Sequence, residues 1–107
     1  MQYINLTPHV IVVSTLGKVK SYQRSGTIIR VDQNYRTIGE ADGFPVRANH
    51  KLDHYMPPVV PGITYIVSAL VLMQVKHAGR TDCLAPDSNH ANRDHDGNII
   101  SVPGWLG

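Results

Sequence analysis

Ile63 to Gly79 reads ITYIVSALVLMQVKHAG, and this stretch decides the architecture of the chain. The β-branched residues up to Val67 predict a strand, and Ser68 is a favoured helix N-cap. The following residues predict the one helix of the chain, at about 68–78, because Gly79 stands where a left-handed C-terminal cap is needed. Apolar side chains surround most of this helix, so we expect it to be largely buried.

The rest of the chain predicts short strands. Runs rich in β-branched and aromatic residues alternate with Gly-containing turns, which is typical of strands joined by hairpins. The predicted strands and extended segments are 10–14, 18–22, 27–31, 35–38, 44–46 and 99–102, and prolines make 49–62 a long loop. Together these elements predict an α+β fold, a small twisted antiparallel or barrel-like sheet with one buried helix packed on it.

Length and composition indicate one domain, 1–107. The chain has 107 residues, of which 42% are hydrophobic and 17% charged, as in globular proteins. A core of this size is modest, so a homo-oligomer would supply further burial. The formal net charge is only +2 and the arginines are scattered, which argues against a nucleic-acid partner.

The cysteine content and the apolar runs favour a cytoplasmic protein. Cys83 is the single cysteine, so no internal disulfide forms, as is usual in a reducing compartment. Asp82 beside it would raise the pKa of the thiol, which predicts an inert side chain. The first residues show no signal-peptide pattern, and the longest apolar run, 63–73, is too short to cross a membrane.

Six histidines invite a metal site, but their neighbours argue against one. His50 and His54 have the spacing of zinc ligands on a helix, yet Lys51 replaces the glutamate of the metalloprotease pattern. His90 and the segment 94–96 resemble the start of a calcium loop whose glycine and final glutamate are misplaced. We interpret both clusters as solvated loop residues and expect neither a metal nor another cofactor.

The junction between the predicted strand and helix at Ser68 is the strongest candidate for a binding site. The first N–H groups of a helix have no intrahelical partner and favour a phosphate. Arg30 lies at the end of the predicted strand 27–31, Arg80 follows the predicted helix, and guanidinium groups bind phosphate oxygens well. The alternative is structural: Ser68 caps its own helix, and the arginines pair with Asp82 and Asp87.

The corner Thr7-Pro8-His9 lies between two apolar runs, where a strand is expected to end. Pro8 fixes the backbone before His9 and gives the ring a defined direction, which suits a general base or a ligand contact. The alternative is a structural histidine that is hydrogen-bonded to a nearby carbonyl.

Four segments together resemble a known family. They are 4–9 (INLTPH), 25–31 (SGTIIRV), 61–68 (PGITYIVS) and 80–87 (RTDCLAPD). In these segments the chain is similar to a family of small, largely uncharacterised proteins from bacteriophage, prophage and actinobacterial genomes that open with Ile-Asn-Leu-Thr-Pro-His. The similarity covers most of the chain. Segments 49–58 and 89–96 depart from the family pattern, in which an acidic, Gly-containing stretch is expected instead.

The resemblance implies a phage-type origin and no particular activity. Small phage proteins of this size often act by binding, and some sequester nucleotide signals of host defence, which gives an analogy rather than a mechanism.

The leading functional hypothesis is a cytosolic protein that binds an anionic, nucleotide-like small molecule. Its pocket is expected to join Thr7 and His9, the helix start at Ser68 and the loop 80–87. Arg30 and Arg80 would neutralise phosphate in this pocket. Asp82 or Asp87 would accept a hydrogen bond from a ribose or a base.

Two other classes of function stay open. The first is a small hydrolase or lyase acting on a nucleotide-like ligand, with His9 as general base and Asp82 or Asp87 as its partner. The second is an inhibitor that docks on a host protein. It would use exposed side chains, namely Tyr55, Met56 and Trp105.

Overall fold

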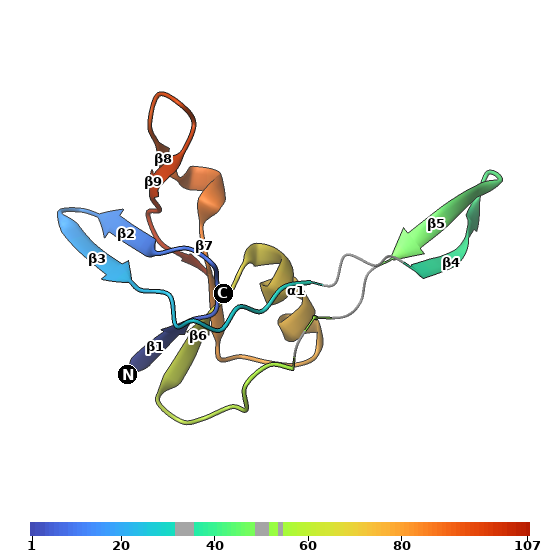
Figure 1. Ribbon diagram of the computed structural model, residues 1–107, viewed down its shortest axis with the longest axis horizontal. Helices are drawn as coiled ribbons and strands as arrows, with labels where there is room; N and C mark the ends of the chain where they lie inside the picture. Colours follow the sequence, from blue (N-terminus) through green and yellow to red (C-terminus); the bar gives the residue numbers. More distant parts are fainter. Residues whose placement is uncertain (32–35, 49–51, 54) are drawn as a thin grey trace.

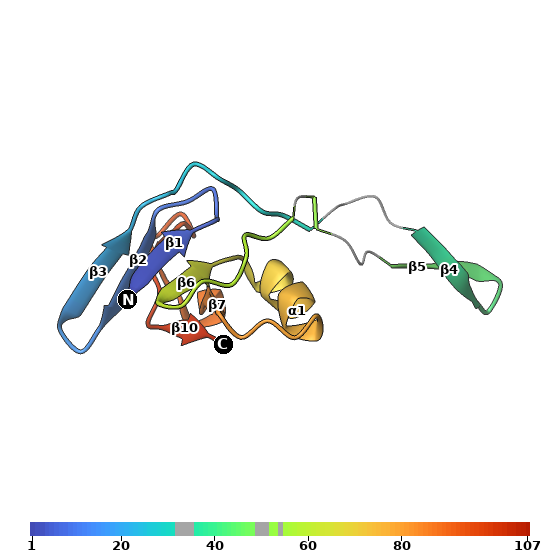
Figure 2. The ribbon, with the colours of Figure 1, turned by 90° about the horizontal axis from the view of Figure 1, so that it is seen from below.

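The computed structural model describes residues 1–31, 36–48, 52–53 and 55–107. Its centre is a four-stranded sheet in the order β1-β6-β7-β10, of which Figure 1 labels the first three strands and Figure 2 labels all four. The strands are β1 (Gln2–Asn5), β6 (Ile63–Ile66), β7 (Cys83–Pro86) and β10 (Trp105–Leu106). β6 is parallel to both β1 and β7, whereas β10 runs antiparallel to β7. α1 (Ala69–His77) connects β6 to β7, because parallel neighbours need a crossover connection.

Hairpins make up the other strands of the described chain. They are β2 (Ile11–Thr15) with β3 (Lys18–Tyr22), β4 (Arg36–Ala41) with β5 (Phe44–Ala48), and β8 (Asn92–Arg93) with β9 (Ile99–Ser101). The 3₁₀ helix η1 (Ser88–His90) precedes β8. Asp42 and Gly43 join β4 to β5 with φ values of 53° and 80°. Two successive positive values are characteristic of the tight turn whose twist matches that of hairpin strands.

The predicted α+β class is confirmed, with open, twisted sheets and one helix. Antiparallel pairing holds within the three hairpins. The central sheet differs from the expectation because its pairs β1–β6 and β6–β7 are parallel. A helix between two strands of one sheet returns the chain to its starting edge, so the strands that it joins run in the same direction.

The boundaries of α1 agree with the sequence prediction. Ser68 is the N-cap, and its Oγ accepts a hydrogen bond from the N–H of Val71 at 3.3 Å. Gly79 follows the helix with a φ of 91°, and its N–H donates to the carbonyl of Lys76 at 2.9 Å. In the described part of the chain, no helix is long and apolar enough to cross a membrane.

The expectation that this helix is largely buried is wrong. Leu70 and Met73 are 66% and 69% exposed, whereas Val71, Leu72 and Val75 are buried. The central sheet covers one side of α1, so Leu70 and Met73 on the other side stay largely exposed within the described chain. Sequence composition does not predict how much of the helix is exposed, because composition does not show whether one layer or two layers pack on the helix.

The core lies between the buried side of α1 and the central sheet. Its members come from β6, β7, α1 and the segments after β1 and β3: Leu6, Ile29, Tyr65, Val67, Val71, Leu72, Val75, Cys83 and Ala85. This core fixes the ends of β1 and β6 and the start of α1 relative to one another.

One prediction for the middle of the chain needs correction. Segment 27–31 is not a strand: only Val31 forms an isolated bridge, with Leu52. Ile29 is buried there, and its N–H donates to the carbonyl of Leu6 at 3.1 Å. Of the predicted strand 35–38, residue 35 lies outside the described residues and the rest belongs to β4. In 49–62, residues 49–51 and 54 lie outside them too, and the others form no helix or strand.

The hairpin 36–48, which we call the arm, stands apart from the rest of the chain (Figures 1 and 2). Within the described residues its strands pair only with each other. The Cα radius of gyration is 16.0 Å. A compact domain of this length would have about 13 Å. The arm therefore has little support from its own chain.

Candidate functional site

Three parallel strands end at the same edge of the central sheet. β1 ends just before the corner Thr7-Pro8-His9, β6 ends before Ser68, and β7 ends before Ser88. In open sheets of this kind, ligands bind outside the carboxyl ends of parallel strands, where the loops that follow them meet. The topology explains why residues as far apart in sequence as His9 and Ser68 become neighbours.

The side chain of Asn5 holds the corner in shape. Asn5 is 2% exposed, and its Nδ2 donates to the carbonyls of His9 at 2.7 Å and Tyr22 at 3.1 Å. Its Oδ1 accepts from the N–H of Thr7 at 2.9 Å and from the Thr7 hydroxyl at 2.7 Å. Both amide hydrogens and both acceptor positions are thus used. Thr7 is also buried, so its hydroxyl stabilises the corner.

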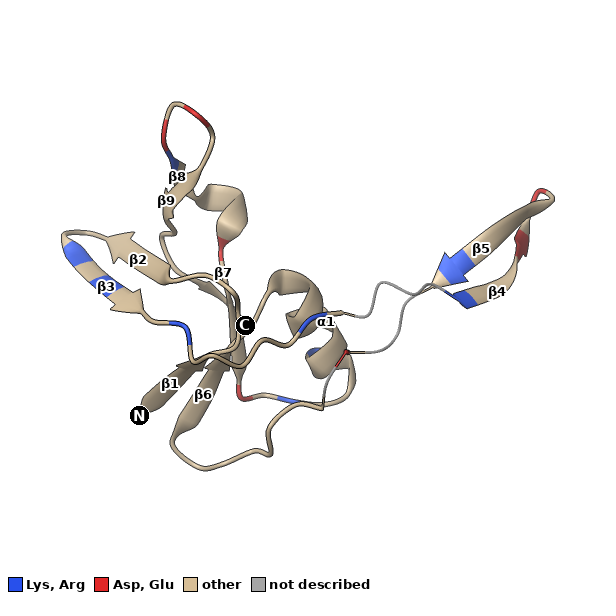
Figure 3. Ribbon diagram, in the orientation of Figure 1, with Lys and Arg blue, Asp and Glu red and all other residues tan. Residues whose placement is uncertain are grey.

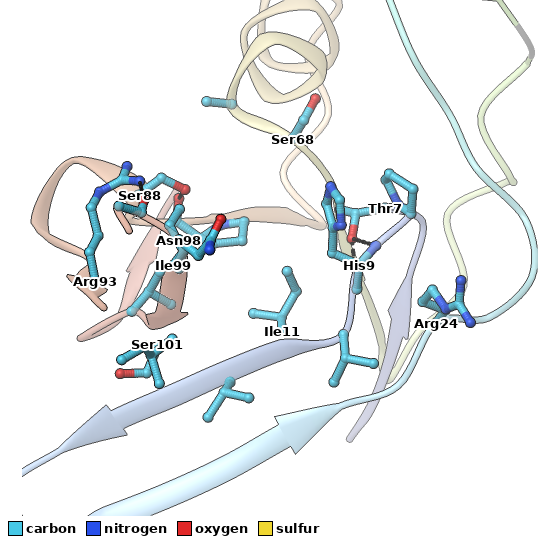
Figure 4. A pocket seen from close by; sticks show the side chains of 18 of the residues that line it. Thr7, His9, Ile11, Arg24, Ser68, Ser88, Arg93, Asn98, Ile99 and Ser101 are labelled. Atoms are coloured by element: carbon cyan, nitrogen blue, oxygen red, sulfur yellow. Dashed lines mark hydrogen bonds between the residues drawn. The ribbon is translucent and has the colours of Figure 1, made fainter. Parts of the chain in front are cut away.

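A cavity of about 890 Å³ opens beside this corner (Figure 4). His9 and Ser68 lie at one side of it, and side chains of the β8–β9 region, Asn98 and Ser101 among them, lie at the other. The lining residues come from the corner, β2, the segment after β3, the start of α1 and the β7–β9 region: Thr7, Pro8, His9, Val10, Ile11, Val12, Arg24, Ile29, Arg30, Ser68, Ala69, Pro86, Ser88, Arg93, Gly97, Asn98, Ile99, Ile100, Ser101 and Val102.

The charged residues that line the cavity are all arginines. They are Arg24, Arg30 and Arg93, and the described lining includes no Asp or Glu. Nη1 of Arg93 donates to the carbonyl of Gly97 at 2.7 Å, which ties Arg93 to the β8–β9 turn. Among the described residues, neither Arg24 nor Arg30 forms an ion pair with a carboxylate. An arrangement of cations without acids attracts an anion.

The start of α1 adds hydrogen-bond donors to the same cavity. Ser68 and Ala69 line it, and Ser68 Oγ satisfies the N–H of Val71. The N–H groups of the first turn lack intrahelical partners, and the helix dipole makes this end positive. Ser68 therefore caps the helix, as the structural alternative supposed, and also borders the cavity, as the binding hypothesis requires.

His9 is exposed at the rim of the cavity. Its backbone carbonyl is held by Asn5, but its ring has no hydrogen-bond partner within the described residues. The alternative of a ring bonded to a nearby carbonyl is therefore not what the structure shows. The ring is accessible to a molecule in the cavity.

Arg80 and Asp82 do not line the cavity, contrary to the expected pocket. They pair with each other instead: Nε and Nη2 of Arg80 each donate to a carboxylate oxygen of Asp82 at 2.8 Å. This hydrogen-bonded pair raises the pKa of Arg80 and lowers the pKa of Asp82. Arg80 is far from the cavity because Ser68 and Arg80 flank opposite ends of α1. At about 1.5 Å per residue, these two ends lie about 14 Å apart.

Asp87 lies near the cavity but does not border it. It follows β7 between the lining residues Pro86 and Ser88, and its carboxylate contacts Nδ1 of His90 at 2.8 and 3.1 Å. Asp87 is therefore engaged by a loop histidine. Neither Asp82 nor Asp87 lies beside His9, so the pairing expected for a hydrolase or lyase is missing from the described chain.

The three side chains expected to form an exposed docking surface differ in how far they are exposed. Tyr55 is fully exposed, but Met56 packs against the core. Trp105 is half-buried against the ring of Tyr22, with a centroid distance of 5.2 Å. This surface is therefore not the continuous apolar patch that the hypothesis needs.

Sequence reasoning missed Arg24, Arg93 and Asn98 as lining residues and Asn5 as the support of the corner. Arg24 and Arg93 flank predicted turns, so each looked like one of several scattered charges. Asn5 carried a usable signal, because an Asn two residues before a Thr at a strand end is able to bond back to the backbone.

Within the described ranges, no three His, Cys, Asp or Glu side chains gather as a metal site. His50 and His54 lie outside the described residues. His95 contacts Asp96 at 3.6 Å, and both side chains are largely exposed. No protein-family model, no curated protein and no solved structure matches this chain.

Proposed function

We propose that this chain is a binding protein for a small anionic molecule that carries a phosphate and an apolar, nucleoside-like part. The observation that carries the proposal is the cavity at the carboxyl ends of β1, β6 and β7, whose charged lining residues are all arginines. Arg30 and Arg24 are the phosphate-binding candidates because, within the described chain, no carboxylate pairs with their guanidinium groups. Asp53 contacts Arg30 only through the Arg30 backbone N–H, at 2.8 Å.

The apolar lining supports the nucleoside-like half of the proposal. Val10, Ile11 and Val12 of one wall and Ile99 and Ile100 of another offer surfaces on which a flat base could pack. Asn98, Ser88 and Ser101 supply hydrogen-bonding groups between these walls. A volume of about 890 Å³ falls within the range of about 300–1,000 Å³ that is usual for small-molecule sites.

Binding is favoured over catalysis because His9 lacks a carboxylate partner in the described chain. A general base of this kind is usually oriented by a third group. The resemblance to phage and prophage proteins suggests a setting for such a binder, namely the cytoplasm of an infected cell, where it would sequester a nucleotide signal of host defence.

Isothermal titration calorimetry tests the proposal. The panel is AMP, ADP-ribose, a cyclic mononucleotide and a cyclic dinucleotide, with adenosine as the uncharged control. At least one phosphate-bearing compound should bind, and its affinity should fall as salt rises, because exposed charges are screened. Absence of heat with every compound, or equal binding of adenosine, contradicts the proposal.

Two arginine variants then locate the site. Arg30→Gln removes a charged donor from the cavity, where such hydrogen bonds contribute about 1.5–3 kcal/mol, so affinity should fall by about 10- to 100-fold. Arg47→Gln makes the same change on the arm, outside the cavity, and should leave affinity unaltered. Chromatography of the recovered nucleotide separates a binder, which returns it intact, from an enzyme.

A further inference from the structure

The arm (36–48) has one apolar face and one polar face. Residues that pair across antiparallel strands lie on the same face of a hairpin. The pairs Ala41–Phe44 and Gly39–Val46 form an apolar face over the outer part of the arm, and the pair Arg36–Ala48 lies on the same face at the base of the arm. Glu40–Pro45 and Thr37–Arg47 form the other face. Phe44 is 70% exposed and Val46 is 38% exposed. The apolar face is therefore open to solvent in the single chain.

A two-stranded hairpin that stands alone is at best marginally stable in water, because it buries no apolar face. The arm lies away from the core (Figures 1 and 2). Ile38, at the irregularity in the register of β4, adds a further apolar side chain that is 61% exposed. A natural hairpin with this distribution needs a surface on which to pack.

The outer side of α1 offers a second exposed apolar surface. Leu70 and Met73 are three positions apart, so they lie next to each other on one side of the helix. Both are more than half exposed. We call Leu70 and Met73 the apolar stripe of α1. The last turn of the helix follows this stripe and carries Lys76 and His77. Lys76 Nζ donates a hydrogen bond to the carbonyl of Gly107 at 2.9 Å.

The charges of the two surfaces are complementary. The arm carries Glu40 and Asp42 at its tip, and its arginines lie at its base (Figure 3). Along α1 the apolar stripe precedes the basic last turn. Phe44 lies next to the acidic tip of the arm, and Met73 lies one turn before Lys76. Contact of Phe44 with Leu70 and Met73 therefore places the acidic tip close to the basic last turn of α1.

We propose that the arm of one chain packs on the outer side of α1 in a second copy of this chain, and that the second copy returns the contact, forming a two-fold dimer. The chain itself carries both halves of the interface, and an exchange about a two-fold axis covers both apolar surfaces of both copies at once. This inference goes beyond the proposed ligand site and does not depend on it, because neither surface lines the cavity.

A cysteine pair tests which surfaces meet. Protein carrying Phe44→Cys is mixed with protein carrying Met73→Cys and oxidised mildly. The native Cys83 is buried and does not compete. The expected product is a disulfide-linked heterodimer with twice the 11.8 kDa mass of the chain. Arg47→Cys on the polar face of the arm is the matched control, and equal cross-linking of this variant to Met73→Cys overturns the proposal.

The oligomeric state provides the second test. Light scattering during gel filtration, over a range of concentrations, should give twice the chain mass for the unaltered protein. Phe44→Ser and Met73→Ser should each raise the dimer dissociation constant at least tenfold, whereas Arg47→Ser should not. Circular dichroism of each variant shows that the monomer is still folded.

Two outcomes of these measurements contradict the proposal. If the unaltered chain stays monomeric at millimolar concentration, the arm does not bind a second copy of this chain, and a different protein would have to cover its apolar face. A dimer that withstands Phe44→Ser and Met73→Ser, with its mass unchanged on dilution, uses some other surface.

Discussion

Asn5→Ala should cost about 3 kcal/mol of folding free energy, because it deletes the hydrogen bonds by which the Asn5 side chain holds the Thr7-Pro8-His9 corner and joins it to Tyr22. The side chain makes four hydrogen bonds of 2.7–3.1 Å and is 2% exposed. A typical bond contributes about 0.5–1.5 kcal/mol net, and a buried partner that is left without a bond adds to the loss. Small domains have only about 5–15 kcal/mol in total, so the effect is large.

Urea unfolding followed by circular dichroism measures this loss. The midpoint should fall markedly for Asn5→Ala, and the melting temperature should drop by about 10 °C or more. Asn92→Ala is the control, because the exposed amide of Asn92 donates one hydrogen bond, to Ser101 Oγ at 3.0 Å, and its loss should cost less than about 1 kcal/mol. If both variants lose the same small amount, Asn5 is not the support of the corner.

Three further predictions concern the helix and its flanks. Asp82→Asn should cost about 1–3 kcal/mol at pH 7. Arg80 holds the pKa of Asp82 below its ordinary value of 3.8, so this stabilisation is complete above that value and disappears as the pH falls through the lowered pKa. The free energies of unfolding of both proteins, measured in urea, should therefore converge as the pH falls below 3.8, and a constant difference contradicts the assignment. Burial raises the pKa of Cys83 to about 11, so Ellman's reagent at pH 8 should label the thiol in urea but hardly at all in the native protein, and rapid native labelling would show that the thiol is accessible. Ser68→Ala should lower the free energy of unfolding in urea by about 1 kcal/mol, because the N–H of Val71 loses its hydrogen-bond acceptor. Ser68→Asp keeps an acceptor at this position and should cost less, and the reverse order would show that Ser68 does not act as a cap.

The local part of the fold followed from the sequence. Ser68 and Gly79 bound α1 as predicted, because each cap depends on backbone conformation and hydrogen bonds within a few residues. The predicted Gly-containing turns between neighbouring strands are found at Leu16-Gly17 and Asp42-Gly43, where all four residues have positive φ values. The strand predicted at 27–31 is wrong, although its β-branched residues are typical of strands. In the structure Ile29 packs in the core, and the segment has no continuous partner strand among the described residues.

The candidate site was predictable only in part. Ser68, Thr7 and His9 follow strands of one parallel set, and Arg30 joins them at the cavity. The order of strands in the sheet depends on pairings between residues that are distant in sequence, such as Gln2 with Ile63. Local sequence patterns do not predict such pairings. The misplacement of Arg80 was avoidable, because a helix separates the residues at its two ends by its own length.

The pairing of β1 with β6 also has a consequence for the order in which the protein is made and folded. The first strand emerges from the ribosome long before Ile63 to Ile66, and closing so long a segment costs about 3–4 kcal/mol of chain entropy. The hairpins, by contrast, close over a few residues and form early. The cavity is completed late, because its lining extends to Val102 and a nascent chain lacks that wall until the β8–β9 region has been synthesised.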